Sequence, residues 1–201
     1  MKKILLCVLM AGVMSSCSIM MTSYGVSLNS VESPSNSKVK YGETQVVMIE
    51  QEGLSKYKFE DDYIEIFWYV GTKEFNFELT NKSDYTIKLN WDDMAYVDLN
   101  GTTSRVMHSG VKYIDRNNSQ PASVLPKNAS MTDILLPTDN IYYSEYYGWQ
   151  SHRLFRYYNS NTEAQLSTDI GKTVRIIFPI VIQDVVNEYI FEFKIDSISV
   201  K

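Results

Sequence analysis

Apolar residues recur at every second position in several short stretches from residue 63 onward. A period of two is typical of strands that bury one face, as in antiparallel sheets. The inward positions form five runs: Ile64, Ile66 and Trp68; Phe75, Phe77 and Leu79; Ile87, Leu89 and Trp91; Val174, Ile176, Phe178, Ile180 and Ile182; Tyr189, Phe191, Phe193 and Ile195. This pattern predicts an all-β protein.

Turn-forming residues separate these runs. Asn81 to Asp84 predicts a turn after the second run, and Asn100-Gly101 is a strong signal of a tight hairpin. Pro179 lies inside the fourth run and cannot donate to a strand ladder, so it predicts an edge strand or a bulge. Further strands are expected over 44–49, 94–98, 105–108 and 131–136, and no amphipathic helix is expected.

About eight short strands with turns between them favour a β-sandwich. Within residues 75–137, a strand, Asn81-Lys82-Ser83, a second strand and later Pro126-Lys127-Asn128 follow in order. This order resembles the immunoglobulin-like domains of bacterial envelope lipoproteins, including those of Bacteroidetes. The resemblance implies an antiparallel immunoglobulin-like β-sandwich and no particular activity. The expected core comprises Trp68, Phe77, Leu89, Trp91, Ile176, Phe178, Phe191 and Phe193.

The amino terminus carries the features of an export signal. Lys2 and Lys3 precede an apolar stretch over 4–13, which is half the roughly twenty residues that a spanning helix needs. Small residues then lead to Cys17, in an order that resembles the lipobox of bacterial lipoprotein precursors. The resemblance implies that the Cys17 thiol takes a diacylglyceryl group and that the chain is cut before it. A plain cleaved signal peptide with an incidental cysteine is the alternative.

The chain therefore divides into a signal peptide (1–16), a Ser- and Asn-rich flexible tether (17–43) and a β-sandwich domain (44–201). Ser18 stands where an Asp would hold many lipoproteins at the inner membrane, which favours the outer membrane. No acidic run follows Cys17, which favours the periplasmic face. The expected partner is thus the membrane, through the lipid.

Charge and cysteine content limit the partners and reactions that can be expected of the chain. The 201 residues carry a formal charge of −5, which becomes −7 once the two lysines of the signal peptide are removed. Nucleic acid is excluded as a partner, because its binding needs clustered Lys and Arg. Cys7 lies in the signal peptide, so the mature chain holds only Cys17 and has no disulfide or thiol nucleophile.

No group of residues in the sequence identifies a reaction. His108 and His152 are the only histidines and lack the short spacing of a zinc site. The pairs Asp61-Asp62 and Asp92-Asp93 are interpreted as solvated strand ends rather than as a glycosidase dyad. The loop 115–119 has some likeness to a calcium loop but lacks its Gly and Glu. No catalytic residue, metal or cofactor is expected.

An aromatic segment, Tyr142–Tyr158, is the most unusual stretch, with eight aromatic residues in seventeen. Tyr, Trp and Arg dominate interface hot spots, and aromatic faces also stack on sugars. The candidate binding surface for an envelope protein, a peptide or a glycan comprises Tyr146, Tyr147, Trp149, Arg153 and Arg156. The alternative is an excursion that covers the sandwich, with Leu154 and Phe155 buried.

Two functions remain open from these features. The first is a non-catalytic module of the envelope that binds a ligand or serves an assembly. The second is a carboxylate-dependent hydrolase that acts on envelope glycans. The first is preferred, because the second has no motif and immunoglobulin-like scaffolds serve widely in binding, although fold alone does not determine function.

Replacement of the anchor residue tests the export prediction. Cys17→Ser removes the thiol that accepts the lipid, so we expect an unprocessed or soluble protein that incorporates no labelled palmitate. Equal incorporation by the variant and the parent chain would rule out Cys17 as the lipid site.

Overall fold

The computed structural model describes residues 21–32, 45–51 and 54–200. Antiparallel strands make up most of this part of the chain, which confirms the all-β prediction. Twelve strands share one sheet, whose main hydrogen-bonded path runs β1 (Thr22–Glu32), β14 (Val185–Val200), β13 (Thr173–Ile182), β7 (Ala95–Val97), β8 (Thr103–Met107), β10 (Ser130–Pro137), β5 (Phe75–Asn81), β4 (Ile64–Val70), β3 (Leu54–Glu60), β2 (Gln45–Gln51).

Two short strands lie off this path, and one of them pairs with β13. β6 (Ile87–Leu89) pairs with residues 180–182 of β13 on one side and with β9 (Ser123–Leu125) on the other. β7 pairs with residues 175–177, so β6 and β7 lie end to end along one edge of β13. Residues 90–94 between them, including the 3₁₀ turn η1 (Trp91–Asp93), stand opposite residues 178 and 179. Pro179 therefore lies in a central strand, where its pairing with Glu188 of β14 is regular and the ladder on its other side is interrupted, so the expected edge strand or bulge is not found.

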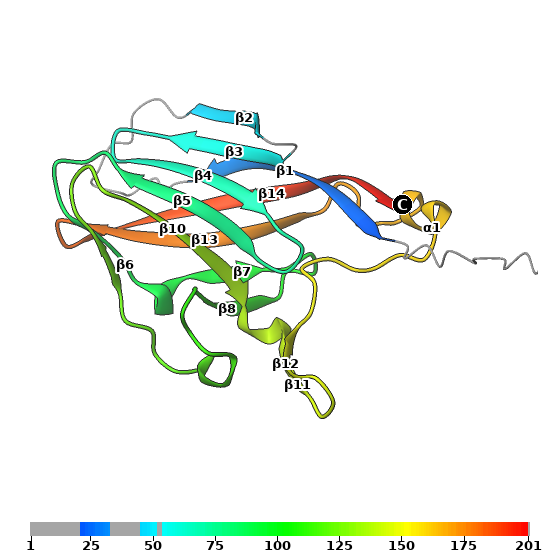
Figure 1. The fold of residues 1–201 in the computed structure, drawn as a ribbon. Helices are drawn as coiled ribbons and strands as arrows, with labels where there is room; N and C mark the ends of the chain where they lie inside the picture. Colours follow the sequence, from blue (N-terminus) through cyan, green and yellow to red (C-terminus); the bar gives the residue numbers. More distant parts are fainter. Residues whose placement is uncertain (1–20, 33–44, 52–53, 201) are drawn as a thin grey trace, which may run out of the picture.

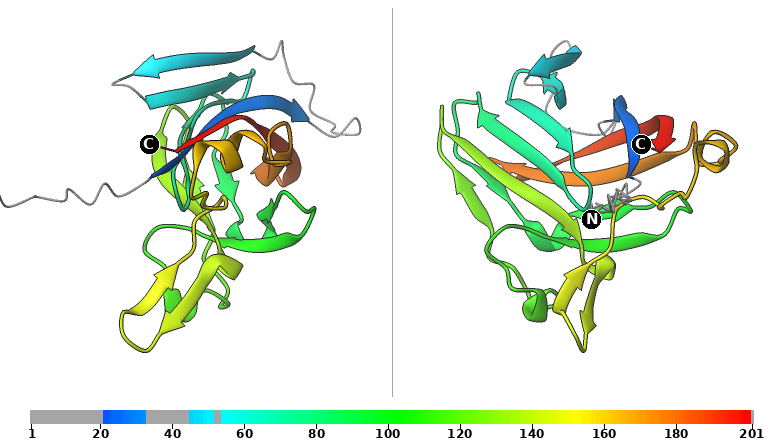
Figure 2. Two further views of the ribbon diagram at one scale, coloured as in Figure 1. Left: turned by 90° about the vertical axis from the view of Figure 1, so that its right-hand side faces the viewer. Right: turned by 45° about the vertical axis from the view of Figure 1, so that its right-hand side comes forward.

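The sheet curls until it nearly closes into a barrel (Figures 1 and 2). The predicted immunoglobulin-like sandwich of two sheets is wrong. Alternation along a strand specifies which residues point inward, but two facing sheets and one curled sheet satisfy it equally well. The pairing of β10 with both β5 and β8 makes the difference, because it joins what a sandwich would keep as separate sheets.

Aromatic rings fill the interior of the barrel. The Trp68 ring of β4 lies 5.6 Å from Phe178 on β13, and 5.0 and 5.7 Å from Phe191 and Phe193 on β14, between ring centres. β4 is remote from β13 and β14 in the strand order, so these contacts cross the interior. All eight core residues expected from the sequence are buried, which confirms that part of the prediction.

A buried carboxylate ties the β3–β4 turn to β14. Asp61 Oδ1 accepts the backbone N–H groups of Tyr63 and Ile64, each at 2.8 Å, and Oδ2 accepts the Tyr189 hydroxyl at 2.8 Å. Burial raises the pKa of this carboxyl. Asp61 is therefore a structural residue, whereas its neighbour Asp62 is exposed as expected.

Residues 22–32 were expected to belong to a flexible tether, but they form β1 and pair with β14. Val26 and Leu28 bury their side chains in the main core. The surrounding Ser and Asn residues conceal this alternation in the sequence, because they occupy the outward positions. A bulge follows Gly25, where a Cβ atom would lie 2.4 Å from Ser197 Oγ, so a larger residue there would require the Ser197 hydroxyl to rotate away.

One short helix is present, too short to be the amphipathic helix that the sequence did not predict. α1 (Asn161–Gln165) begins after Ser160, whose Oγ accepts the Glu163 N–H at 3.2 Å. Ser and Glu three residues apart are the sequence signature of a capping box. This signal was available in the sequence, just after the aromatic segment.

Removal of one central ring tests the filled barrel. Phe191 contacts the rings of Phe59, Trp68 and Phe178, and Phe191→Ala leaves a cavity among them, so we expect a loss of about 3–5 kcal/mol in the free energy of unfolding. Val186→Ala, at an exposed residue near the start of β14, is the matched control and should change it by less than about 0.5 kcal/mol. Urea unfolding measures both. Similar small losses in the two variants would contradict the packing described.

Candidate functional site

The aromatic segment forms a hairpin that stands apart from the barrel. β11 (Ile141–Ser144) and β12 (Gly148–Ser151) pair only with each other, and Figures 1 and 2 show them projecting from one side of the barrel. Residues 145–147 make the turn, and Gly148 follows with φ of +68°, a conformation that side chains disfavour. The predicted lid over a sandwich is therefore not what this stretch forms.

Tyrosine rings are exposed at the tip of this hairpin. Tyr146 is 91% exposed and Tyr147 is 81% exposed, and Tyr142 and Tyr143 behind them are also exposed. The tip extends beyond the barrel (Figure 2), and among the described residues these rings stay largely uncovered. Large apolar side chains gathered in one exposed place are unusual on a monomer and mark interaction sites.

A small second core holds the base of the hairpin. Ile141 is buried with Met107 of β8 and Leu136 of β10, and Trp149 packs against this cluster. The Arg116 guanidinium lies 4.9 Å from the centre of the Trp149 ring, after the 3₁₀ turn η2 (Tyr113–Asp115). Trp149 is therefore a half-buried support of the hairpin rather than part of its exposed tip.

Polar and aromatic contacts continue from this base. The His152 ring stacks on Tyr142 with centres 4.2 Å apart, and the His152 N–H donates to the Asn140 carbonyl at 2.8 Å. The Leu154 N–H then donates to the Thr72 carbonyl at 2.9 Å. These contacts fix where the hairpin leaves the barrel, so the tip projects from a held base.

The five candidate residues do not form one surface. Tyr146 and Tyr147 lie at the tip, and Trp149 lies on β12. Arg153 and Arg156 follow the hairpin, with their guanidinium groups 5.8 Å from the Tyr157 ring and 5.2 Å from the Tyr158 ring. The structure thus separates the tyrosine tip from an arginine-bearing segment that runs along β1. Cys17, the expected lipid site, lies outside the described residues.

The segment after the hairpin closes one end of the barrel. Phe155 is buried and Leu154 packs against the core, as the lid hypothesis expected of these two residues. The Tyr24 hydroxyl donates to the Arg156 carbonyl at 2.5 Å, and burial is the main cause of the raised pKa of Tyr24.

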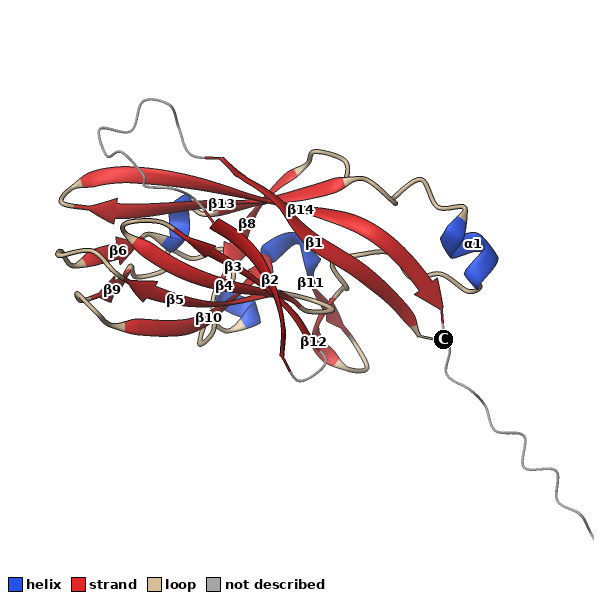
Figure 3. Cartoon of the chain, turned by 90° about the horizontal axis from the view of Figure 1, so that it is seen from above, coloured by secondary structure: helices blue, strands red, loops and turns tan. Residues whose placement is uncertain are grey.

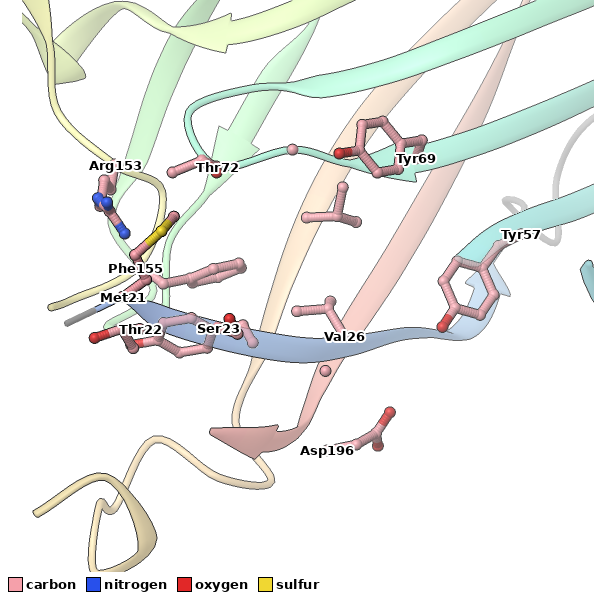
Figure 4. Close-up of a pocket in the computed structure, with 14 residues that line it drawn as sticks. Met21, Thr22, Ser23, Val26, Tyr57, Tyr69, Thr72, Arg153, Phe155 and Asp196 are labelled. Atoms are coloured by element: carbon pink, nitrogen blue, oxygen red, sulfur yellow. The ribbon is translucent and has the colours of Figure 1, made fainter. Parts of the chain in front are cut away.

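A cavity of about 500 Å³ opens between this segment, β1 and the end of β4 (Figure 4). Arg153 and Asp196 are its charged lining residues, and Tyr57, Tyr69 and Phe155 supply aromatic walls. The rest of its lining comes from Met21, from β1 residues 22–26, among them Tyr24, and from residues 70–72 at the end of β4 and the start of the β4–β5 turn. The cavity lies at the gap where the barrel fails to close, and it gathers no cluster of acid or base groups.

His108 is not the isolated residue that the sequence indicated. Its Nδ1 lies 3.3 Å from Asp133 Oδ2, and its ring stacks on buried Trp91 with centres 4.2 Å apart. Asp133 also accepts the Ser109 N–H, while Gln120 accepts the His108 N–H and donates to the Val106 carbonyl. These bonds fix the connection after β8. Asp133 lies 25 residues from His108, so no sequence spacing pointed to the pair.

The side chain of Arg105, from β8, bonds to backbone carbonyls of the loop 115–119, which was considered as a calcium loop. Arg105 donates from Nη1 to the Asn117 carbonyl at 2.8 Å and from Nη2 to Asp92 at 2.7 Å. Asp92 also accepts from Ser119, and this hydrogen bond is the main cause of its lowered pKa. Asp93 accepts from Asn90. Within residues 21–32, 45–51 and 54–200 no three His, Cys, Asp or Glu side chains gather as metal ligands.

Comparison with known proteins assigns this chain to no family. No family model matches the chain, and no curated protein matches it. A crystal structure of a Northeast Structural Genomics Consortium target, SoR45, is similar at 13% identity over 89% of this chain and 86% of that one, with a TM-score of 0.28. This likeness is too low to carry an argument. Among the described residues, no helix has the length and hydropathy to span a bilayer.

Truncation of Trp149 tests whether this ring supports the hairpin. Because the ring is only half-buried, we expect Trp149→Ala to lower the free energy of unfolding by about 1–2 kcal/mol, less than a fully buried Trp would. Tyr147→Ala at the tip serves as the control and should leave stability within about 0.5 kcal/mol. Equal effects of the two changes would show that the base and the tip are not distinct.

Proposed function

We propose that this chain is a lipid-anchored protein of the bacterial envelope that binds a protein partner through the tip of the β11–β12 hairpin. The anchor is a lipid on Cys17, in the outer membrane and on its periplasmic face. The order of basic, apolar and small residues before Cys17 supports the anchor. The role is that of a binding or assembly module without catalysis.

The exposure of Tyr146 and Tyr147 is the observation that carries the binding proposal. A tyrosine ring offers a large contact area at a low cost in side-chain entropy, and its hydroxyl supplies a hydrogen bond. The two rings sit on a turn whose base is packed and hydrogen-bonded. A supported turn loses less conformational entropy on binding, so less of the binding free energy is spent on ordering it.

The shape of the tip favours a protein over a glycan. Small-molecule sites are concave and surround their ligand. The hairpin tip is convex and projects, so its rings suit insertion into a groove on a larger partner, where buried aromatic anchors carry most of the binding energy. We therefore propose an envelope protein with an apolar groove as the partner.

The alternative of a carboxylate-dependent glycan hydrolase draws no support from the acidic pairs. Asp61 is engaged by Tyr63, Ile64 and Tyr189, and Asp92 by Arg105 and Ser119. Both carboxylates serve the local structure, so neither pair offers two free groups to one substrate.

Site-specific photocrosslinking in living cells tests the binding proposal. A benzoylphenylalanine in place of Tyr146 should give one discrete adduct with an envelope protein, and the same group in place of Tyr85, an exposed tyrosine outside the hairpin, should not. Tyr146→Ala combined with Tyr147→Ala should weaken binding of the identified partner by about tenfold or more, with stability unchanged.

Two results would contradict this proposal. Adducts that form equally at positions 85 and 146 would show that the tip has no special role. Binding of the purified chain to an envelope glycan that depends on Tyr146 would replace the protein partner with a glycan.

A further inference from the structure

The start of β1 sets how far the barrel can stand from a lipid on Cys17. Thr22 already pairs with Val200 in the sheet, so only residues 18–21 separate the lipid-bearing residue from the barrel. A fully extended chain covers roughly 3.4 Å per residue, which gives a reach of about 17 Å from Cys17 to Thr22. The end of the barrel at Thr22 must then lie close to the membrane.

Several segments meet at this end. Thr22 Oγ1 donates to the Tyr158 carbonyl at 3.1 Å and accepts the Tyr158 N–H at 2.9 Å. The Val200 N–H donates to Asn161 Oδ1 at 2.6 Å, which holds α1 against the last residues of β14. Figures 1 and 3 show α1, the start of β1 and the end of β14 together at one extremity of the molecule.

Exposed apolar side chains lie on Met21 and on the segment 157–170, which is bonded to the start of β1 and the end of β14, and we call them the anchor-end rim. The rim consists of Met21, which is 56% exposed, Leu166, which is 77% exposed, and Tyr157 and Ile170, which are also exposed. Leu166 closes α1, and Ile170 follows Asp169, which accepts the Tyr158 hydroxyl at 2.9 Å. The rim therefore sits on segments that are bonded to the start of β1.

Charge at this end differs from that of the whole protein. The chain as a whole is acidic, but the segment 153–172 carries Arg153, Arg156 and Lys172 against Glu163 and Asp169, a net charge of +1. Anionic lipid headgroups repel an acidic protein except where its local charge is neutral or basic. Long basic side chains beside apolar ones suit an interface, because their stems lie in it while their charges reach water.

We propose that the anchor-end rim docks on the bilayer surface, with its apolar side chains in the headgroup region. This inference rests on the proposed lipid at Cys17. Exposed Leu, Ile, Met and Tyr side chains with Arg and Lys near them in the sequence match the composition of surfaces that lie in a membrane interface. The aromatic hairpin projects from the side of the barrel in Figure 1, so docking at this end leaves its tip free.

The test uses the full chain, processed in a bacterial host and reconstituted into vesicles of phosphatidylethanolamine and phosphatidylglycerol. Leu166→Cys introduces a thiol for a fluorophore, and Val186→Cys, at a 57% exposed residue near the start of β14 at the opposite extremity, is the matched control. Cys7 leaves with the signal peptide and Cys17 is lipidated, so the new thiol is the only one to react. A headgroup-nitroxide lipid then quenches any fluorophore near the surface.

We expect quenching at position 166 to exceed that at position 186 by about threefold or more. Met21→Ser with Ile170→Ser should then reduce quenching at position 166, because it removes apolar rim side chains and keeps the tether length. Unchanged quenching in that variant would show that the tether alone brings the end close, and would overturn docking. Equal quenching at both positions would also overturn the docking proposal. Self-quenching without vesicles would overturn it too, because it would indicate that a second copy of the chain covers the rim.

Mass spectrometry of the purified chain separates failure of the anchor from failure of the docking. A chain without lipid mass would contradict the proposed anchor, and the docking would fail with it. A lipidated chain with equal quenching at the two positions would contradict the docking alone.

Discussion

The long β13–β14 hairpin and the aromatic rings on its inner face are the constraint on which the rest of the structure depends. β14 pairs with β13 along the whole length of that strand and with β1 on its other side. Phe178 and Phe191 on its inner face contact Trp68 on the opposite wall. Because these rings meet across the interior, the sheet curls around a core filled with aromatic side chains. The cavity of about 500 Å³ lies at the edge of this core, between β1 and the end of β4.

The outside of the barrel carries two exposed apolar groups that serve different proposed purposes. Tyr146 and Tyr147 project from the side on a hairpin with its own small core. Met21 and Leu166 lie at the extremity where the chain would reach a lipid on Cys17. A rigid body with functional side chains on its connections is a common arrangement, because the body holds the connections in place while they vary. In this account, one group faces the membrane and the other is free to meet a protein.

The sequence was sufficient to predict the core and the strands that line it from residue 63 onward, because burial on one face leaves a period of two, but not β1, β3 or the β11–β12 hairpin. It was insufficient for the barrel, because closure depends on contacts between distant segments, such as that of Trp68 with Phe191. The β1 strand was hidden because Ser and Asn residues fill its outward positions around Val26 and Leu28. The site was partly predictable: composition pointed to Tyr146 and Tyr147, but only the fold separates them from the two arginines.

Chemical modification of tyrosines measures most directly whether the hairpin tip is an interface. Nitration of the isolated chain, mapped by mass spectrometry, should be fast at Tyr146 and Tyr147 and negligible at Tyr189, which is fully buried. In intact cells the account predicts strong protection of Tyr146 and Tyr147, while Tyr85 reacts as it does in the isolated chain. Equal rates at Tyr146 and Tyr147 in the isolated chain and in cells would contradict the account.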